Sequence, residues 1–261
     1  TDFGHQDIYV GVMKGVIAQI SPAATVIDLC HEIPSQDCAA ARFQLMAAYR
    51  YFPVGTIHVI VVDPGVGTQR RAIAIQTPTA YFIAPDNGVL SGILHHEEIL
   101  AAIELNVPRY WLTIAPSATF QGRDIFAPVA AHLANGLPLY QLGTPMDPTT
   151  LQQLSIPPVA TIDKGWQGCI QAIDHFGNLV TNIPGHLVTA FPAAPHWTVR
   201  YQEQIYPGYM TYGNAAIGQV LGLVGSHGYI ELAVNHGNAQ QQLNAMIGDA
   251  IAVLIDPSEF A

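Results

Sequence analysis

The sequence has little charge for its length. Only 11% of its 261 residues are Asp, Glu, Lys or Arg, the formal net charge is −10, and Lys14 and Lys164 are its two lysines. A nucleic-acid-binding protein needs a basic surface that neutralises phosphates, and this composition cannot supply one. We therefore expect no nucleic-acid partner.

Long apolar runs, cysteine pairs and metal-binding motifs are also missing. No apolar run reaches the ~18 residues of a membrane span, and no basic segment followed by an apolar one opens the chain, so neither membrane insertion nor secretion is indicated. The three cysteines, Cys30, Cys38 and Cys169, form no CxxC pair, which favours free thiols in a reducing, cytoplasmic compartment. Eleven histidines occur without HExxH or zinc spacing, so we expect no metal. The chain opens at Thr1 without a methionine, which suggests that its true start lies upstream.

The first half of the chain alternates between helix-like and strand-like segments. Apolar spacing and a capping Asp37 predict helices, and short apolar runs predict strands. The expected helices are 9–20, 37–51 and 124–135, the last ended by Gly136. The expected strands are 24–29, 56–62, 72–76 and 81–84, the last two as a hairpin-like unit, with a turn at 85–88. This alternation predicts an α/β domain over residues 1–154 with a largely parallel sheet.

The second half has a different pattern. A proline-bearing stretch, SIPPV at 155–159, begins an expected linker over 155–165. Short β-forming runs separated by Gly, Pro, Asn and His then predict an antiparallel, barrel-like β domain over 166–261. The expected strands are 168–173, 179–182, 197–201, 220–224, 229–234 and 250–255.

The most specific stretch in the first half is VVDPGVGTQRR, residues 61–71. Ligands of α/β proteins gather at the carboxyl ends of strands, which is where Asp63 should lie. The glycines match neither GxGxxG nor GxxxxGK[ST], so a phosphate loop is not indicated. From the residues alone, Asp63 could serve a site together with Arg70, or it could cap the DPG turn while Arg70 and Arg71 pair with surface acids.

Several long motifs resemble one family, in order and over nearly the whole chain. They are TDFG (1–4), DIYVGVMKG (7–15), FPVGTIHVIVVDPGVGTQRR (52–71), YFIAPDNGVL (81–90), TFQGRDIFAPVAAHL (119–133), IDHFGNLVTNI (173–183) and SHGYIELAVNHGNA (226–239). They look like the S-adenosyl-L-methionine (SAM) hydroxide adenosyltransferases, or SAM hydrolases, relatives of fluorinase and chlorinase. The resemblance implies an α/β domain, a β-barrel domain, and a homotrimer with sites between the domains of neighbouring subunits. It also implies attack of water or hydroxide on the adenosyl 5′ carbon, without a metal or cofactor.

The resemblance also implies catalytic roles. Asp63 would orient and help deprotonate the water, and Arg70 would stabilise developing hydroxide, while Arg71 would make a structural ion pair. The family's histidine in TFHGRD is Gln121 here, and a glutamine cannot relay a proton near neutral pH. Either Asp63 does the proton work and Gln121 positions the water, or turnover is slowed. We expect His132, in the following helix, to be a packing or capping residue.

The substrate contacts follow from the same motifs. Asp2 would bind the ribose hydroxyls, Asp7 and Asp174 would face the methionine ammonium group, and Asn178 would bind the adenine edge. Tyr212 would stack on adenine, and Ser226 would hold the carboxylate or a polar tail. Glu231 and the backbone of Val234 would line the nucleoside pocket. Each residue also has an ordinary structural alternative as a cap, turn residue or strand residue.

The expected function is therefore hydrolysis of SAM to adenosine and L-methionine. One alternative is a protein that binds SAM or adenosine with weak or no turnover, because of Gln121. A halide-using adenosyl transferase is less favoured, since the fluorinase-like site lacks the acid at Asp63 and carries an insertion where 76–81 is short.

Overall fold

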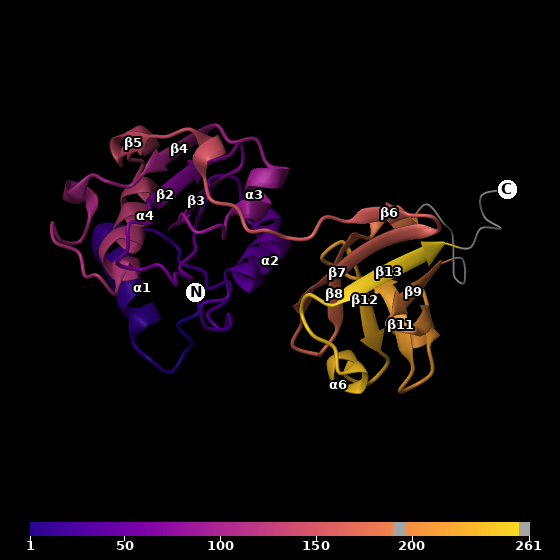
Figure 1. The fold of residues 1–261 in the computed structure, drawn as a ribbon. Helices are drawn as coiled ribbons and strands as arrows, with labels where there is room; N and C mark the ends of the chain where they lie inside the picture. The colour runs from indigo at the N-terminus through magenta and orange to yellow at the C-terminus, as the bar shows by residue number, and fades with distance from the viewer. Residues whose placement is uncertain (190–196, 256–261) are drawn as a thin grey trace. The chain divides into compact units, whose positions relative to one another are not determined.

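The computed structural model describes residues 1–189 and 197–255, and the chain divides into two compact units, 1–154 and 155–261 (Figure 1). Residues 256–261, the end of the predicted C-terminal domain, lie outside the described residues. Each unit has its own hydrophobic core.

The N-terminal unit is built around a five-stranded sheet of order β1-β3-β2-β4-β5. Its strands are β1 (Thr56–Val59), β2 (Ala72–Gln76), β3 (Ala80–Pro85), β4 (Ala101–Glu104) and β5 (Thr144–Pro145). The sheet is mixed, whereas the sequence predicts a largely parallel one: β1 and β3 pair in parallel, and the other neighbours are antiparallel. Only residues 77–79 separate β2 from β3, and a parallel pair would need a crossover of about a dozen residues.

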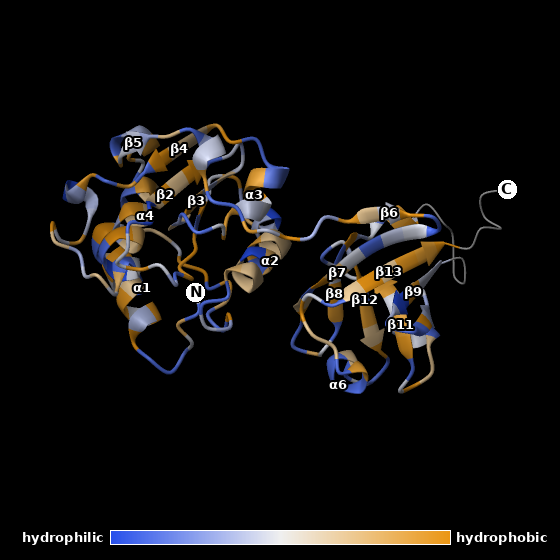
Figure 2. Cartoon of the chain, in the orientation of Figure 1, coloured by the Kyte–Doolittle hydropathy of each residue, from blue (hydrophilic) through white to orange (hydrophobic). Residues whose placement is uncertain are grey.

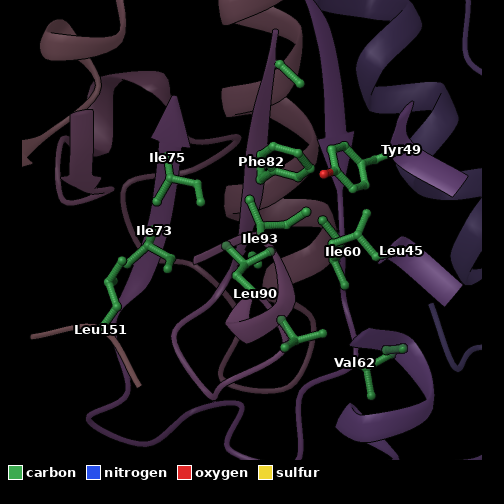
Figure 3. Packing of buried hydrophobic residues seen from close by; sticks show 14 of the residues in the cluster. Leu45, Tyr49, Ile60, Val62, Ile73, Ile75, Phe82, Leu90, Ile93 and Leu151 are labelled. Carbon is green, nitrogen blue, oxygen red and sulfur yellow. The ribbon is translucent and has the colours of Figure 1, made fainter. Parts of the chain in front are cut away.

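Helices cover both faces of this sheet. The helices are α1 (Tyr9–Ile20), α2 (Cys38–Ala48), α3 (Ser91–His96) and α4 (Ala127–Ala134), with short helical turns η1 (Tyr49–Tyr51), η2 (Pro108–Tyr110), η3 (Gly122–Phe126), η4 (Leu139–Gln141) and η5 (Pro148–Thr150). Because side chains alternate across a strand, Ile73, Ile75 and Phe82 pack toward α2 and α3 (Figure 3), whereas Ala74 and Ile83 pack toward α1 and α4.

Most of the predicted elements of this unit are present. Helix α1 has the predicted bounds, and the Asp37 carboxylate caps α2 by accepting the Ala40 N–H at 2.8 Å. The predicted strand 56–62 ends earlier, at Val59, and the predicted helix 124–135 begins as a π-helical turn, η3, before α4. Gly136 follows α4 with φ +84°, as a helix stop.

The predicted strand 24–29 is wrong. Residues 24–30 are irregular, and Val26 and Ile27 are 43% and 63% exposed. A strand needs a neighbour to bond its backbone, and a cavity bordered by this segment and by β1 lies where the two would have to meet.

The C-terminal unit is an antiparallel sheet of order β10-β9-β13-β7-β8-β12-β11, with β6 paired to β7. The sheet nearly closes, because the Tyr209 N–H beyond β10 donates to Gly222 of β11 at 2.8 Å. The strands are β6 (Ala160–Ile162), β7 (Gly165–Ile173), β8 (Leu179–Pro184), β9 (Trp197–Tyr201), β10 (Gln204–Pro207), β11 (Val220–Val224), β12 (Tyr229–Val234) and β13 (Ala250–Ile255), with α5 (His186–Thr189), η6 (Tyr212–Asn214) and α6 (Ala239–Leu243).

The barrel-like prediction is confirmed, and all six predicted strands are present. The expected linker 155–165 contains β6, which pairs with β7. Strands β12 and β13 are apolar along most of their length, whereas α6 is hydrophilic (Figure 2). The side chains of β12 and β13 therefore supply part of the core, together with Ile170, Leu179 and residues of β9.

Candidate active site

The chain carries Asp63 into the site on a buried segment that follows β1. Val61 and Val62 are buried, and the Asn87 amide donates to the Val62 carbonyl at 2.8 Å. Asp63 then opens the DPG turn, with its carbonyl accepting the Val66 N–H at 3.2 Å. The Asn87 bond ahead of Asp63 and the turn that follows it thus fix the backbone that carries this residue.

Asp63, Arg70 and Gln121 form one hydrogen-bonded cluster. The Arg70 Nε lies 2.9 Å from both Asp63 carboxylate oxygens, and Arg70 Nη2 also pairs with Asp63 Oδ2. Arg70 Nη2 donates to Gln121 Oε1 at 2.5 Å. The Asp63 and Arg70 side chains are only 6% and 10% exposed, so the pair is shielded from water and stronger than a surface ion pair. The structure thus brings together the three predicted catalytic residues.

Arg70 determines which way the Gln121 amide faces. A guanidinium only donates, so the Gln121 atom beside it must be the carbonyl oxygen. The Gln121 Nε2 and the Arg70 Nη1 keep hydrogens without a partner among residues 1–189 and 197–255. Gln121 directly precedes the π-helical turn η3, a feature often found at functional sites. A water placed here would meet N–H donors from Gln121 and Arg70 and one carboxylate, that of Asp63.

Arg71 and His132 lie outside this cluster, as expected. Arg71 pairs with the buried Asp86, with Nε 2.9 Å from Oδ2, so the predicted structural ion pair is confirmed. The His132 ring packs edge-on against Tyr110 at 5.3 Å, and burial lowers its pKa. His132 is thus a packing residue, as predicted.

Asp2 lies in the first turn of the chain. Its Oδ2 accepts the Gln36 N–H at 2.8 Å, and Gln36 has φ +64°, a conformation that costs a non-glycine residue energy. Burial raises the pKa of the Cys38 thiol to about 11, and the charges of Asp37, Asp63 and Asp2 add to this effect. Asp2 and Asp63 are thus both close enough to Cys38 for their charges to act on its thiol.

Asp7 makes no hydrogen bond or ion pair with any part of the chain that the structure describes, and it is exposed. Its side chain is therefore available to solvent or a ligand.

Asp174 and Asn178 form one tight turn in the C-terminal unit. Asp174 Oδ1 accepts the Phe176 and Asn178 N–H groups at 2.9 and 2.8 Å, and its Oδ2 accepts the Asn178 amide at 2.9 Å. The Asp174 carboxylate therefore organises the turn, and the Asn178 carboxamide oxygen has no hydrogen-bond partner among residues 1–189 and 197–255. Gly177 has φ +83°, and a Cβ there would lie 2.2 Å from the Asn238 side chain.

Glu231 lies at the centre of a second polar cluster in this unit. It is 3% exposed, accepts the Tyr212 hydroxyl at 2.5 Å, and lies 3.0 Å from His227 Nε2. Burial, with Glu231 next in effect, raises the pKa of Tyr212. Ser226 is exposed beside this cluster, and Val234 is buried at the end of β12.

Sequence reasoning missed three residues of these clusters. Asn87 bonds the chain ahead of Asp63, and His227 bonds Glu231. The Phe176 ring is 71% exposed on the Asp174 turn. In the sequence, an aromatic residue beside the glycine of a turn could have drawn attention to Phe176. No sequence spacing indicates the contacts of Asn87 and His227.

Two hollows border the N-terminal unit. A cavity of about 520 Å³ has mainly apolar walls and is not lined by Asp63, Arg70 or Gln121. An open hollow of about 470 Å³ is lined by Arg70, Asn87 and polar neighbours. Asp63 and Gln121 do not line this second hollow either. We therefore place the candidate site at the hydrogen-bonded cluster of Asp63, Arg70 and Gln121, whose Arg70 borders the second hollow.

The described ranges, 1–189 and 197–255, contain neither a metal-binding group of side chains nor a membrane-spanning helix. No three His, Cys, Asp or Glu side chains are grouped so that they could hold a metal ion. No helix there is long and apolar enough to cross a membrane.

The chain belongs to the SAM hydroxide adenosyltransferase family. Residues 1–143 match the family's N-terminal domain and residues 168–252 its C-terminal domain. An (R)-S-adenosyl-L-methionine hydrolase of Salinispora tropica is 39% identical over 97% of this chain and 95% of its own length. A fluorinase of Actinoplanes sp. is 27% identical over 97% and 95%. The crystal structure of an uncharacterized conserved protein from Thermotoga maritima superposes with a TM-score of 0.91 at 36% identity, covering 97% of each chain.

Proposed function

We propose that this protein hydrolyses SAM to adenosine and L-methionine. The observation that carries the proposal is the buried cluster of Asp63, Arg70 and Gln121 in a chain of this family. The similarity to the hydrolase of Salinispora tropica, which is greater than that to the fluorinase, supports water as the nucleophile.

The reaction needs one positioned water. Its oxygen attacks the adenosyl 5′ carbon as the carbon–sulfur bond breaks, and the electron pair of that bond leaves with methionine as a neutral thioether. Asp63 accepts the proton of the water and passes it to solvent. Arg70 and Gln121 donate hydrogen bonds to the oxygen as it gains hydroxide character.

The remaining residues bind the substrate in this proposal. Asp2 accepts the ribose hydroxyls, Asn178 and Tyr212 bind adenine, and Glu231 and Val234 line the nucleoside pocket. Asp7, Asp174 and Ser226 serve the methionine end, with Asp174 acting by shaping its turn. We further propose a homotrimer with sites between neighbouring subunits, a cytoplasmic location, and no metal or cofactor.

Product analysis in labelled water tests the reaction. Purified protein incubated with SAM in H₂¹⁸O should release methionine and adenosine carrying ¹⁸O at its 5′ hydroxyl. Asp63→Asn should lower kcat by roughly 10²–10⁴-fold, the usual contribution of a general base. His95→Gln, an exposed change on α3, is the control and should leave kcat unchanged. Adenosine without ¹⁸O, or an Asp63→Asn protein as active as wild type, would refute the mechanism.

A binding protein with little turnover is the second candidate, and Gln121 favours it because glutamine relays no proton. It predicts thermal stabilisation by SAM without adenosine release. Adding chloride or fluoride to the same incubation tests the halide alternative, which predicts a halogenated nucleoside.

A further inference from the structure

We propose that His31 is a positioning residue for Asp2, through a chain of hydrogen bonds that runs from Lys14 through Asp28 and His31 to Thr1. The proposal rests on the proposed function, because it takes Asp2 as the acceptor of the ribose hydroxyls.

The chain of hydrogen bonds is continuous. Lys14 Nζ donates to Asp28 Oδ2 at 2.6 Å, and Asp28 Oδ1 lies 2.9 Å from His31 Nε2. On the other side of the ring, His31 Nδ1 lies 2.9 Å from Thr1 Oγ1. The Phe3 N–H donates to the same hydroxyl at 3.2 Å, so the contacts reach both neighbours of Asp2.

The chain persists in either protonation state of His31. A neutral ring donates from Nε2 to Asp28 and accepts the Thr1 hydroxyl hydrogen at Nδ1. A protonated ring donates at both nitrogens, and the hydroxyl oxygen has lone pairs for both His31 and Phe3. The arrangement is therefore a fixed support, and it does not act as a pH switch.

A second set of contacts holds the same turn. The Gly4 N–H donates to the His31 carbonyl at 2.8 Å, and Gly4 has φ +66°, which favours glycine. The Phe3 ring packs on Tyr9 and Phe120 at 5.7 and 5.9 Å, and Phe120 directly precedes Gln121. Residues 1, 3 and 4 are thus fixed on both sides of Asp2.

Asp2 is left with one oxygen for a ligand. Its Oδ2 accepts the Gln36 N–H, and its Oδ1 has no partner in the part of the chain that the structure describes. The Lys14 and Asp28 side chains are 41% and 38% exposed, and exposed ion pairs add little stability. The function of this chain of bonds is therefore the orientation of the Asp2 turn.

A double-mutant cycle in the full chain tests the proposal. His31→Ala should raise the KM for SAM about tenfold and change kcat less than about threefold, because loss of ground-state positioning weakens binding more than chemistry. In an Asp2→Ala background, His31→Ala should add no further increase in KM. Lys14→Met, which removes only the outer end of the chain, should raise KM by less than His31→Ala does. The control is His5→Ala. The His5 ring packs edge-on against His31 at 5.4 Å and lies 3.9 Å from the exposed Glu32 carboxylate, outside the chain of hydrogen bonds, so this variant should match wild type.

Three results would overturn the proposal. The first is an unchanged KM in His31→Ala. The second is a double variant whose increase in KM equals the product of the increases in the two single variants. The third is a lower kcat at constant KM in His31→Ala, which would report partial unfolding. If His31→Ala does not fold, wild-type KM in Lys14→Met overturns the proposal. If wild type releases no adenosine, the proposed function fails, but the role of His31 can still be tested by measuring adenosine binding with calorimetry. Weaker binding to His31→Ala than to wild type would support that role, and equal binding would refute it.

Discussion

Gln121 presents two amide hydrogens to the candidate site at the position where the family motif has a titrating imidazole. Its carbonyl oxygen accepts a hydrogen bond from Arg70. The Gln121 side chain can therefore stabilise hydroxide through its amide hydrogens, but it cannot accept the proton that the water loses. We expect the pH profile of kcat to lack a histidine limb.

Exchanging this side chain tests its role as a donor. Gln121→Glu should lower kcat by roughly 10²–10³-fold, because it removes a donor to the developing charge. Gln121→His should add an acidic limb with an apparent pKa near the ordinary histidine value of about 6.5. Gln69→Glu, an exposed residue beside Arg70, adds the same charge and should have a much smaller effect. Equal losses in the two glutamate variants would mean that charge, rather than hydrogen bonding, matters.

Sequence patterns could identify these residues but not their contacts. Asp63 and Arg70 are seven residues apart in one motif, so their pairing could be expected. Gln121 lies 51 residues beyond Arg70, and its contact with Arg70 depends on tertiary structure that no local pattern indicates. The sequence predicts that Asp174 faces the methionine ammonium group. In the structure both oxygens of this carboxylate accept hydrogen bonds from Asn178 within the turn, a local role that the motif does not indicate.

At the scale of elements, local patterns predicted helices and isolated strands better than pairing. The β2–β3 hairpin follows from the short connection between its strands. The alternation of helix-like and strand-like segments in the first half of the chain, however, predicted a largely parallel sheet. Residues 24–29 have a strand-like composition, but a strand also requires a partner edge, and that depends on tertiary structure. The C-terminal strands were predicted well because turns bound each of them on both sides.

The loop that carries Arg70 depends on Gly67. Gly67 has φ +79°, and a Cβ there would lie 2.4 Å from the Ala118 carbonyl oxygen. Gly67→Ala should therefore lower the free energy of unfolding by about 2–4 kcal/mol, from backbone strain and the clash together. Gly136→Ala is the matched control, with φ +84° and open space around it, and should cost only about 1 kcal/mol. Urea unfolding measures both, and equal losses would contradict a role for the Ala118 contact.

His58 on β1 should make stability depend on pH. Its ring stacks on Phe82 at 5.1 Å, and its Nε2 has no hydrogen-bond partner in the described part of the chain. Burial lowers its pKa to about 4. An unfolded histidine titrates near 6.5, so between these values the unfolded chain binds more protons and stability falls as the pH falls. The loss for His58 amounts to about 3 kcal/mol by pH 4.

Replacing His58 isolates this contribution from those of His96 and His132, two less buried histidines whose pKa values are also lowered, chiefly by desolvation. His58→Phe should lose less stability than wild type between about pH 6.5 and 4, as measured by urea unfolding at each pH. His95→Phe, at an exposed position, should follow the wild-type curve. Parallel curves for wild type and His58→Phe would show that His58 does not titrate in this window.

At the scale of the whole molecule, the proposed site residues divide between the two units. Asp2, Asp7, Asp63, Arg70 and Gln121 belong to residues 1–154, whereas Asp174, Asn178, Tyr212, Ser226, Glu231 and Val234 belong to residues 155–261. Neither unit holds both the catalytic cluster and the proposed adenine-binding residues. Whether a site draws its halves from one chain or two is therefore a question about assembly.

Mixing two inactive variants answers that question. Asp63→Asn impairs the N-terminal half of a site, and Asn178→Ala impairs the C-terminal half. If each site joins the N-terminal unit of one subunit to the C-terminal unit of the next in a closed ring, equal co-expression should restore about a quarter of wild-type activity, since each half is intact in half of the chains. The control co-expresses Asp63→Asn with Arg70→Ala, which impair the same half and should stay inactive. Activity no higher than that control would place both halves of the site in one chain.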